Sequence, residues 1–129
     1  AASDEIIAAV SSMTGQVDAV FTPTDNVVQA AELAIAPTLA EAGIPHYAGA
    51  DSFVRNGAFA TCGVNYTDLG SQTADLAVEV LTTGRIPEYV TVAGDIITVN
   101  TETAAALGAD YSGFAGMGSQ LVEVQTTQD

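Results

Sequence analysis

Short apolar runs alternate with longer helical patterns along the chain, and this alternation constrains its fold more than any other feature. Runs rich in β-branched and aromatic residues occupy 17–22, 44–49, 58–64 and 96–99. Buried parallel strands joined by helices have this pattern, because a parallel crossover needs about a dozen residues or more. The alternation predicts an α/β fold with an open, mostly parallel sheet, helices on both faces in three layers, and a flavodoxin-like topology.

Helical patterns fill the intervals between these runs and begin at residue types that cap helices. Asp25 or Thr24 precedes the second helical segment, and Thr67 precedes the long fourth one. Pro37 interrupts the second segment and is expected to kink or split it. The predicted helices span 3–14, 25–42, 51–56, 67–83 and 101–107.

The alternation ends near residue 109, which sets the expected domain organisation. A chain of 129 residues has the length of one domain, and residues 1–109 are assigned to a single α/β lobe. Beyond them, Gly113, Gly116 and Gly118 follow no period. Residues 110–129 are therefore expected to form an irregular tail, with room for a short ordered stretch at 120–124.

The charge balance excludes several partners. Sixteen Asp and Glu residues stand against Arg55 and Arg85, lysine is absent, and the formal net charge is -14. Nucleic acids and anionic membranes would repel such a chain, because both bind through clustered cations. No nucleic-acid partner is expected, and no apolar stretch is long enough for a membrane span. The acidity is typical of solubility outside the cell or in salt.

The single cysteine and the single histidine leave little for catalysis or metal binding. Cys62 lies in an apolar stretch and is expected to be a small buried hydrophobe. His46 alone supplies too few nitrogen ligands for a zinc site. A pair of Cys62 and His46 acting as nucleophile and base would need a fortuitous contact in space. The sequence predicts no catalytic residue, no metal site and no cofactor, and hence no enzyme.

Polar residues follow three of the predicted strands at the point where each strand ends. In open parallel sheets, ligands bind at the loops that follow the carboxyl ends of the strands. Those loops come after Thr22, Gly49 and Val64, and they are expected to share one rim. The candidate ligand-binding residues there are Thr24, Asp25, Asn26, Asp51, Ser52, Asn65 and Tyr66.

Each rim residue has an ordinary structural interpretation beside the functional one. Asp25 suits a helix N-cap as well as it suits a carboxylate paired with a ligand ammonium group, and both roles stay open. Thr24 and Asn26 add hydroxyl and amide groups that would hydrogen-bond a ligand. The free N–H groups at the start of this helix also suit a ligand carboxylate.

The other two loops carry similar alternatives. Asp51 is interpreted as a ligand contact, with a cap for the short turn at 51–56 as the alternative. Tyr66 would stack on an aromatic ligand or fill the crossover region, and the latter is slightly favoured. Arg55 is expected to form a salt bridge with a neighbouring carboxylate.

Three segments together resemble the second half of ABC-transporter substrate-binding proteins. They read DAVFTPTDNVV, then AGIPHYAGADSFVRNGAFATCGVNYTDLGSQTADLAVEVLTTGRIPE, then ITVNTETAAALG. Their order and spacing are most similar to the branch associated with aromatic amino acids. The resemblance covers residues 4–109, and the segment after 109 has no counterpart in it.

The resemblance implies one lobe of a bilobal receptor with the type I periplasmic-binding fold. Two α/β lobes close on a small solute, an amino acid here, and the closed form docks on an ABC permease. Residues 66–85 would cross the hinge and pack on the missing N-terminal lobe, while Ile96–Val99 returns to this one. The first strand of the lobe and a signal peptide are expected upstream of Ala1. The expected location is extracytoplasmic, in a periplasm or as a cell-surface lipoprotein.

Two other classes share the alternation. A stand-alone flavodoxin-like or receiver-like signalling domain would use Asp25 and Asp51 to hold Mg²⁺. A receiver also needs a lysine, which the chain lacks, and a flavin site needs a phosphate-cradling loop where the acidic, glycine-free segment 23–26 stands. An enzyme lobe of sugar or nucleotide metabolism would need an acid–base pair, and no spacing argues for one.

Overall fold

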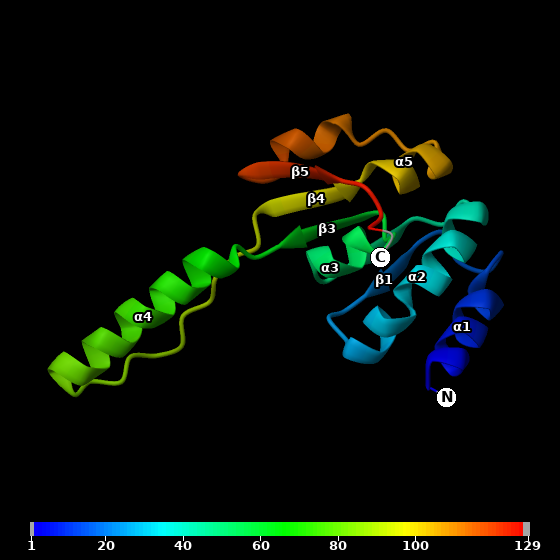
Figure 1. Ribbon diagram of the computed structural model, residues 1–129. Coiled ribbons are helices and arrows are strands. Elements are labelled where there is room, and N and C mark those ends of the chain that lie inside the picture. The colour runs from blue at the N-terminus through cyan, green and yellow to red at the C-terminus, as the bar shows by residue number, and fades with distance from the viewer. Residues whose placement is uncertain (1, 128–129) are drawn as a thin grey trace.

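Five short strands form one mixed sheet in the order of the chain (Figure 1). The computed structural model describes residues 2–127. The first three strands are parallel, the fourth is antiparallel to the third, and the fifth is parallel to the fourth. This arrangement confirms the predicted α/β class with a mostly parallel sheet. The strands are β1 Val20–Thr22, β2 His46–Ala48, β3 Ala60–Gly63, β4 Ile96–Asn100 and β5 Gln120–Val124.

Helices occupy the intervals where they were predicted, with small shifts at their ends. One sheet face packs on the first three helices, and the 3₁₀ helix η1 lies over the other. The first three strands are shorter than predicted, because residues at their ends lie outside the ladders, and β4 extends one residue beyond the predicted 96–99. The helices are α1 Ala2–Met13, α2 Asn26–Glu41, α3 Asp51–Arg55, α4 Tyr66–Thr83, α5 Thr101–Leu107 and η1 Ser112–Gly116.

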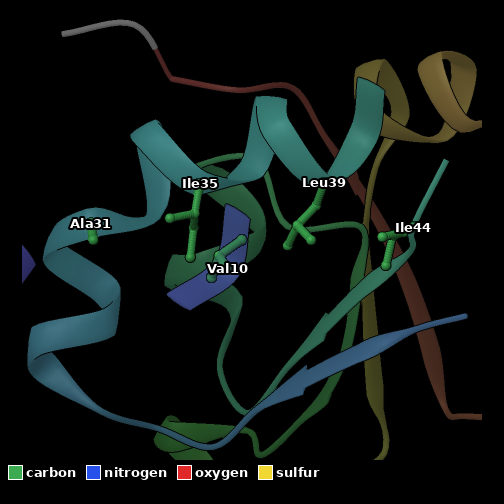
Figure 2. Packing of buried hydrophobic residues seen from close by; sticks show 5 residues of the cluster. All are labelled: Val10, Ala31, Ile35, Leu39 and Ile44. Atoms are coloured by element: carbon green, nitrogen blue, oxygen red, sulfur yellow. The ribbon is translucent and has the colours of Figure 1, made fainter. Parts of the chain in front are cut away.

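The core beneath α2 is built from aliphatic side chains at helical spacing. Figure 2 shows Ile35 and Leu39 pointing from α2 toward Val10 of α1 and toward the sheet, with Ile44 just ahead of β2. Burying a Leu or Ile side chain contributes about 1.5–3 kcal/mol of transfer free energy. This cluster therefore fixes α2, and with it the loop from which α2 starts, against the carboxyl end of β1.

Pro37 does not split α2, which runs unbroken from Asn26 to Glu41. The missing N–H of Pro37 would have bonded the carbonyl of Leu33. Both residues lie on the exposed side of the helix, where water satisfies a free carbonyl. The expected split is therefore wrong: α2 is one helix with its proline on the solvent side.

The structure places two ordered elements where an irregular tail was expected. Residues 112–116 form η1, and β5 coincides with the stretch at 120–124. Gly118 permits the close approach of this segment to β4, since a Cβ there would lie 2.2 Å from the Asp95 carbonyl oxygen. Ser119 N then donates a hydrogen bond to that same oxygen at 2.8 Å. The spacing of the glycines in the sequence gives no sign of such a close contact.

The helix α4 projects away from the sheet, and the segment 84–95 returns alongside it (Figure 1). Its apolar face includes Leu69 and Leu76, which together with Val90 and Val92 of the returning segment line a shallow hollow. None of the described residues of α4 is buried. Among residues 2–127, no helix combines the length and apolar character needed to cross a membrane.

Candidate functional site

The three predicted loops meet at one edge of the sheet. β1, β2 and β3 are parallel neighbours, so the chain leaves all three at the same edge. The first two loops touch: Gly49 N donates to Thr22 O at 2.9 Å. A Cβ on Gly49 would lie 2.9 Å from both the N and Oγ1 atoms of Thr24, so only glycine fits. The shared rim that the sequence predicted is therefore present.

A cavity of about 260 Å³ opens beside this rim, between the loops after β2 and β3 and the first residues of β4 and β5. Asp51 and Tyr66 line it, and so do Arg55 and Cys62. The structure thus brings together candidates from two of the three loops. The remaining candidates do not line this cavity; these are Thr24, Asp25, Asn26, Ser52 and Asn65.

Asp25 is the N-cap of α2. Its Oδ1 atom accepts from Val27 N at 2.8 Å and from Val28 N at 3.0 Å. The structural interpretation of Asp25 is therefore confirmed, while its exposed position at the rim leaves the ligand role as a prediction. Thr24 and Asn26 flank it and are also exposed.

Asp51 is the first residue of α3, and Ala50 holds the cap position without a side-chain bond. The alternative role of Asp51 as a cap is therefore wrong. Its Oδ2 atom instead lies 3.4 Å from Arg55 Nε, which confirms the expected salt bridge. Both side chains are about half exposed, so the pair adds little stability. Ser52 follows in the same helical turn.

Asn65 caps α4, where Thr67 was expected. Its Oδ1 atom accepts from Thr67 N at 3.0 Å and from Asp68 N at 3.2 Å. The helix begins one residue earlier than predicted, at Tyr66, so the side-chain oxygen at 65 is the one that reaches these amides. The Tyr66 ring is exposed next to the cavity.

Cys62 and His46 lie on opposite faces of the sheet. Cys62 is exposed rather than buried, because its face is open beyond η1, and its Sγ atom lies 3.4 Å from Gly94 O. His46 points toward α2. The two side chains cannot form a nucleophile–base pair, and the described residues contain no cluster of three or more metal-ligating side chains.

Sequence reasoning missed a buried polar group behind the rim. His46 Nδ1 lies 2.9 Å from Glu32 Oε1, and His46 Nε2 lies 2.7 Å from Thr22 Oγ1. A signal was available, since Glu32 shares the apolar stripe of α2 with Val28 and Ile35. A carboxylate on such a stripe needs a buried partner.

The fold defines an α/β lobe with a polar rim, and comparison with known proteins gives the family. The chain belongs to the ABC transporter substrate binding protein family, whose model matches residues 1–112. It is 35% identical over 108 residues to a tyrosine-binding protein from Clostridioides difficile, a match that covers 81% of this chain and 31% of the relative. The chain therefore spans about a third of the length of that relative.

Solved structures agree with this assignment. A ligand-free, open substrate-binding protein with adhesive properties from Clostridium difficile matches with a TM-score of 0.78 and 30% identity, over 97% of this chain and 42% of that one. An ABC domain in complex with L-Trp from Streptococcus pneumonia matches with a TM-score of 0.71 and 26% identity, over 93% and 42%. The relatives named by activity are binding proteins rather than enzymes.

Proposed function

We propose that this chain is the second lobe of an extracytoplasmic receptor that captures an amino acid, with an aromatic one favoured, for an ABC importer. The observation that carries the proposal is the rim itself. Three polar loops converge at the carboxyl ends of parallel strands, in a chain of the substrate-binding family. The relatives that bind tyrosine and tryptophan support the aromatic preference.

The rim offers the groups that an aromatic amino acid requires. Asp51 and Asp25 supply carboxylates for the ligand ammonium group, and the Tyr66 ring is placed to stack on an aromatic side chain. The positive end of the α2 dipole also favours the ligand carboxylate, although Val27 N and Val28 N already bond to Asp25. The remaining hydrogen-bonding side chains are Thr24, Asn26, Ser52 and Asn65.

Closure of two lobes would complete the pocket. α4 leaves the rim with an apolar face and no buried residue among those described, which supports a hinge crossover at 66–85 and packing on an N-terminal lobe. The solute contacts both lobes only in the closed state, so binding shifts the population toward closure. The closed receptor then docks on its permease. A signal peptide upstream, with or without a lipid anchor, would deliver it outside the cytoplasm.

Calorimetric titration of the full-length protein with each amino acid tests the proposal. We expect binding of L-tyrosine or L-tryptophan. The 129-residue chain alone should bind at least about 100-fold more weakly, because half of the contacts are missing and each tenfold is about 1.4 kcal/mol. A full-length protein that binds no amino acid would contradict the proposed function.

A pair of matched variants tests the site. Asp51→Asn should weaken binding, because it removes a carboxylate beside the cavity. Asp18→Asn removes an exposed carboxylate ahead of β1, at the opposite end of the strand from the rim, and should leave binding unchanged. Equal effects of the two substitutions would argue against the rim as the binding site.

A further inference from the structure

A buried polar chain links β1, β2 and α2 directly behind the rim. Glu32 is 0% exposed and His46 is 1% exposed. His46 sits between its two partners, with Nδ1 at 2.9 Å from Glu32 Oε1 and Nε2 hydrogen-bonded to Thr22 Oγ1 at 2.7 Å. Thr22 is the last residue of β1 and is itself buried. The chain thus ends where the first rim loop begins.

This arrangement is a poor source of stability. The ion-pair contact lacks an aligned hydrogen bond, so within residues 2–127 neither oxygen of Glu32 nor His46 Nδ1 has a well-formed hydrogen-bond partner. Unsatisfied buried polar atoms are costly, and apolar residues of similar size often replace a buried ion pair without loss. The surrounding core is aliphatic and would accept such residues. Some other property of the polar chain is therefore needed to explain it.

The connectivity supplies that property. Thr22 and Glu32 are the two ends of a segment that contains the rim loop and the first turns of α2. Both ends contact the same imidazole, Thr22 through a hydrogen bond and Glu32 through a short polar contact, so His46 closes this segment into a loop. These two polar contacts hold both ends of the loop at one point on β2. The enclosed segment carries Thr24, Asp25 and Asn26.

We propose that His46 and Glu32 are positioning residues that hold the 23–26 loop in its ligand-binding arrangement. The effect on ligand affinity rests on the proposed function. The positioning of the 23–26 loop by these residues does not depend on it. Neither side chain touches the solute. They act through Thr22 and the start of α2, and they spare the solute the ordering of three rim side chains.

A stability-matched double variant separates positioning from folding. In the full-length protein, Glu32→Leu or His46→Leu alone should lower the Tm by roughly 5 °C or more, because each leaves one buried polar group without its partner. The double variant Glu32→Leu with His46→Leu should recover most of that loss. Its affinity for L-tyrosine should nevertheless stay about tenfold weaker than wild type, the scale expected when three side chains must be ordered on binding.

Amide hydrogen exchange gives a readout that needs no ligand. The amides of Val27 and Val28 are capped by Asp25, within the segment between Thr22 and Glu32. The amides of Glu102 and Thr103 are capped by Asn100, outside that segment. In the double variant we expect faster exchange at the first pair and unchanged exchange at the second. Wild-type exchange at the first pair would overturn the positioning role, whatever the affinity.

Thr22→Val keeps the Glu32–His46 contact and removes only the bond to β1. It should reproduce the faster exchange and a smaller loss of affinity with little change in Tm. Unchanged exchange in this variant would also overturn the role, even if the double variant failed to fold. If the wild-type protein binds no amino acid while this variant still shows faster exchange, that result would support the positioning role of His46 and Glu32 and reject the proposed function.

Discussion

Asn100 joins three parts of the molecule through one fully buried side chain. Its Oδ1 atom accepts from Glu102 N and Thr103 N and so caps α5. Its Nδ2 atom donates to Val54 O in α3 and to Thr126 Oγ1 after β5, both at 2.9 Å. The side chain therefore satisfies groups from elements that are far apart in the sequence.

Asn100→Ala should lower the free energy of unfolding by about 3 kcal/mol, because it removes a cap and the two hydrogen bonds that Nδ2 donates. Asn65→Ala is the matched control: it removes an exposed cap of the same chemistry from α4 and should cost about 1 kcal/mol. Urea unfolding measures both. Equal losses would show that the two Nδ2 hydrogen bonds contribute nothing.

Tyr111 provides a titration that reports on the segment after α5. Its hydroxyl donates to Glu123 Oε1 at 2.7 Å, and this hydrogen bond, with smaller contributions from burial and the Glu123 charge, raises the pKa of Tyr111 above 10.0. The folded state therefore holds the proton more tightly than the unfolded state. The stabilising contribution is complete below pH 10.0 and is lost as the pH rises above that value.

Glu123→Ala should move the titration midpoint of one tyrosine down toward 10.0. Tyrosinate absorbance follows the titration, and Tyr111→Phe identifies which of the four tyrosines contributes the shifted step. A Glu123→Ala profile identical to wild type would mean that the Tyr111–Glu123 bond does not persist in solution.

At this scale the sequence predicted the rim but not the buried partners. A short-range rule placed Asp51, Asn65 and Asp25 at the rim, because each lies within three residues of the end of a strand, and their ligand roles stay predictions. The role of Asn100 depends on Val54, which lies 46 positions away. Neither residue type nor spacing reveals such a partner, and the same holds for the partnership of Glu32 with His46.

At the scale of elements, Gly57 lies in the turn from α3 to β3 and closely approaches α2. Its φ is +113°, and an added Cβ would lie 2.7 Å from Ala36 Cβ on α2. A side chain at 57 would therefore meet both backbone strain and a clash. α2 cannot move away without losing its packing on the sheet.

Gly57→Ala should cost about 2–4 kcal/mol, the sum of strain and overpacking. Gly15→Ala separates the two causes, because Gly15 has a φ of +75° and nothing within 4 Å of its added Cβ, and should cost about 1 kcal/mol. Denaturant unfolding of both variants measures the difference. Similar losses would indicate that α2 adjusts freely at Ala36.

Elements were predicted well where pattern and length agree. The helix at 67–83 was predicted from its periodic apolar face, and the strands near 20, 46 and 60 from short apolar runs, although these strands proved shorter. For β5 the sequence indicated only room for an ordered stretch at 120–124, because a five-residue strand after a glycine-rich stretch has little local signal. Its place in the sheet depends on pairing with β4, which is a long-range property.

The whole molecule combines a helical layer on one sheet face, an opposite face that η1 covers only in part, and the projecting helix α4. On that opposite face, Phe21 is 69% exposed and lines a cavity of about 460 Å³ with Tyr47 and Met117. The sequence predicted the α/β class from its alternation. It could not predict which parts of the sheet the described residues leave uncovered, because that depends on how all the crossovers are arranged in space.

Net charge acts on the molecule as a whole. A formal charge of -14 with only two arginines means that most carboxylates repel one another in the compact state. The Debye length falls from about 30 Å at 0.01 M salt to about 8 Å at 0.15 M, so salt should screen much of this repulsion. The midpoint of urea unfolding should therefore rise between these two salt concentrations. Sodium, potassium and tetramethylammonium chlorides should raise it equally, because screening depends on ionic strength alone. A rise with one cation only would instead indicate specific cation binding and would contradict general repulsion as the cause.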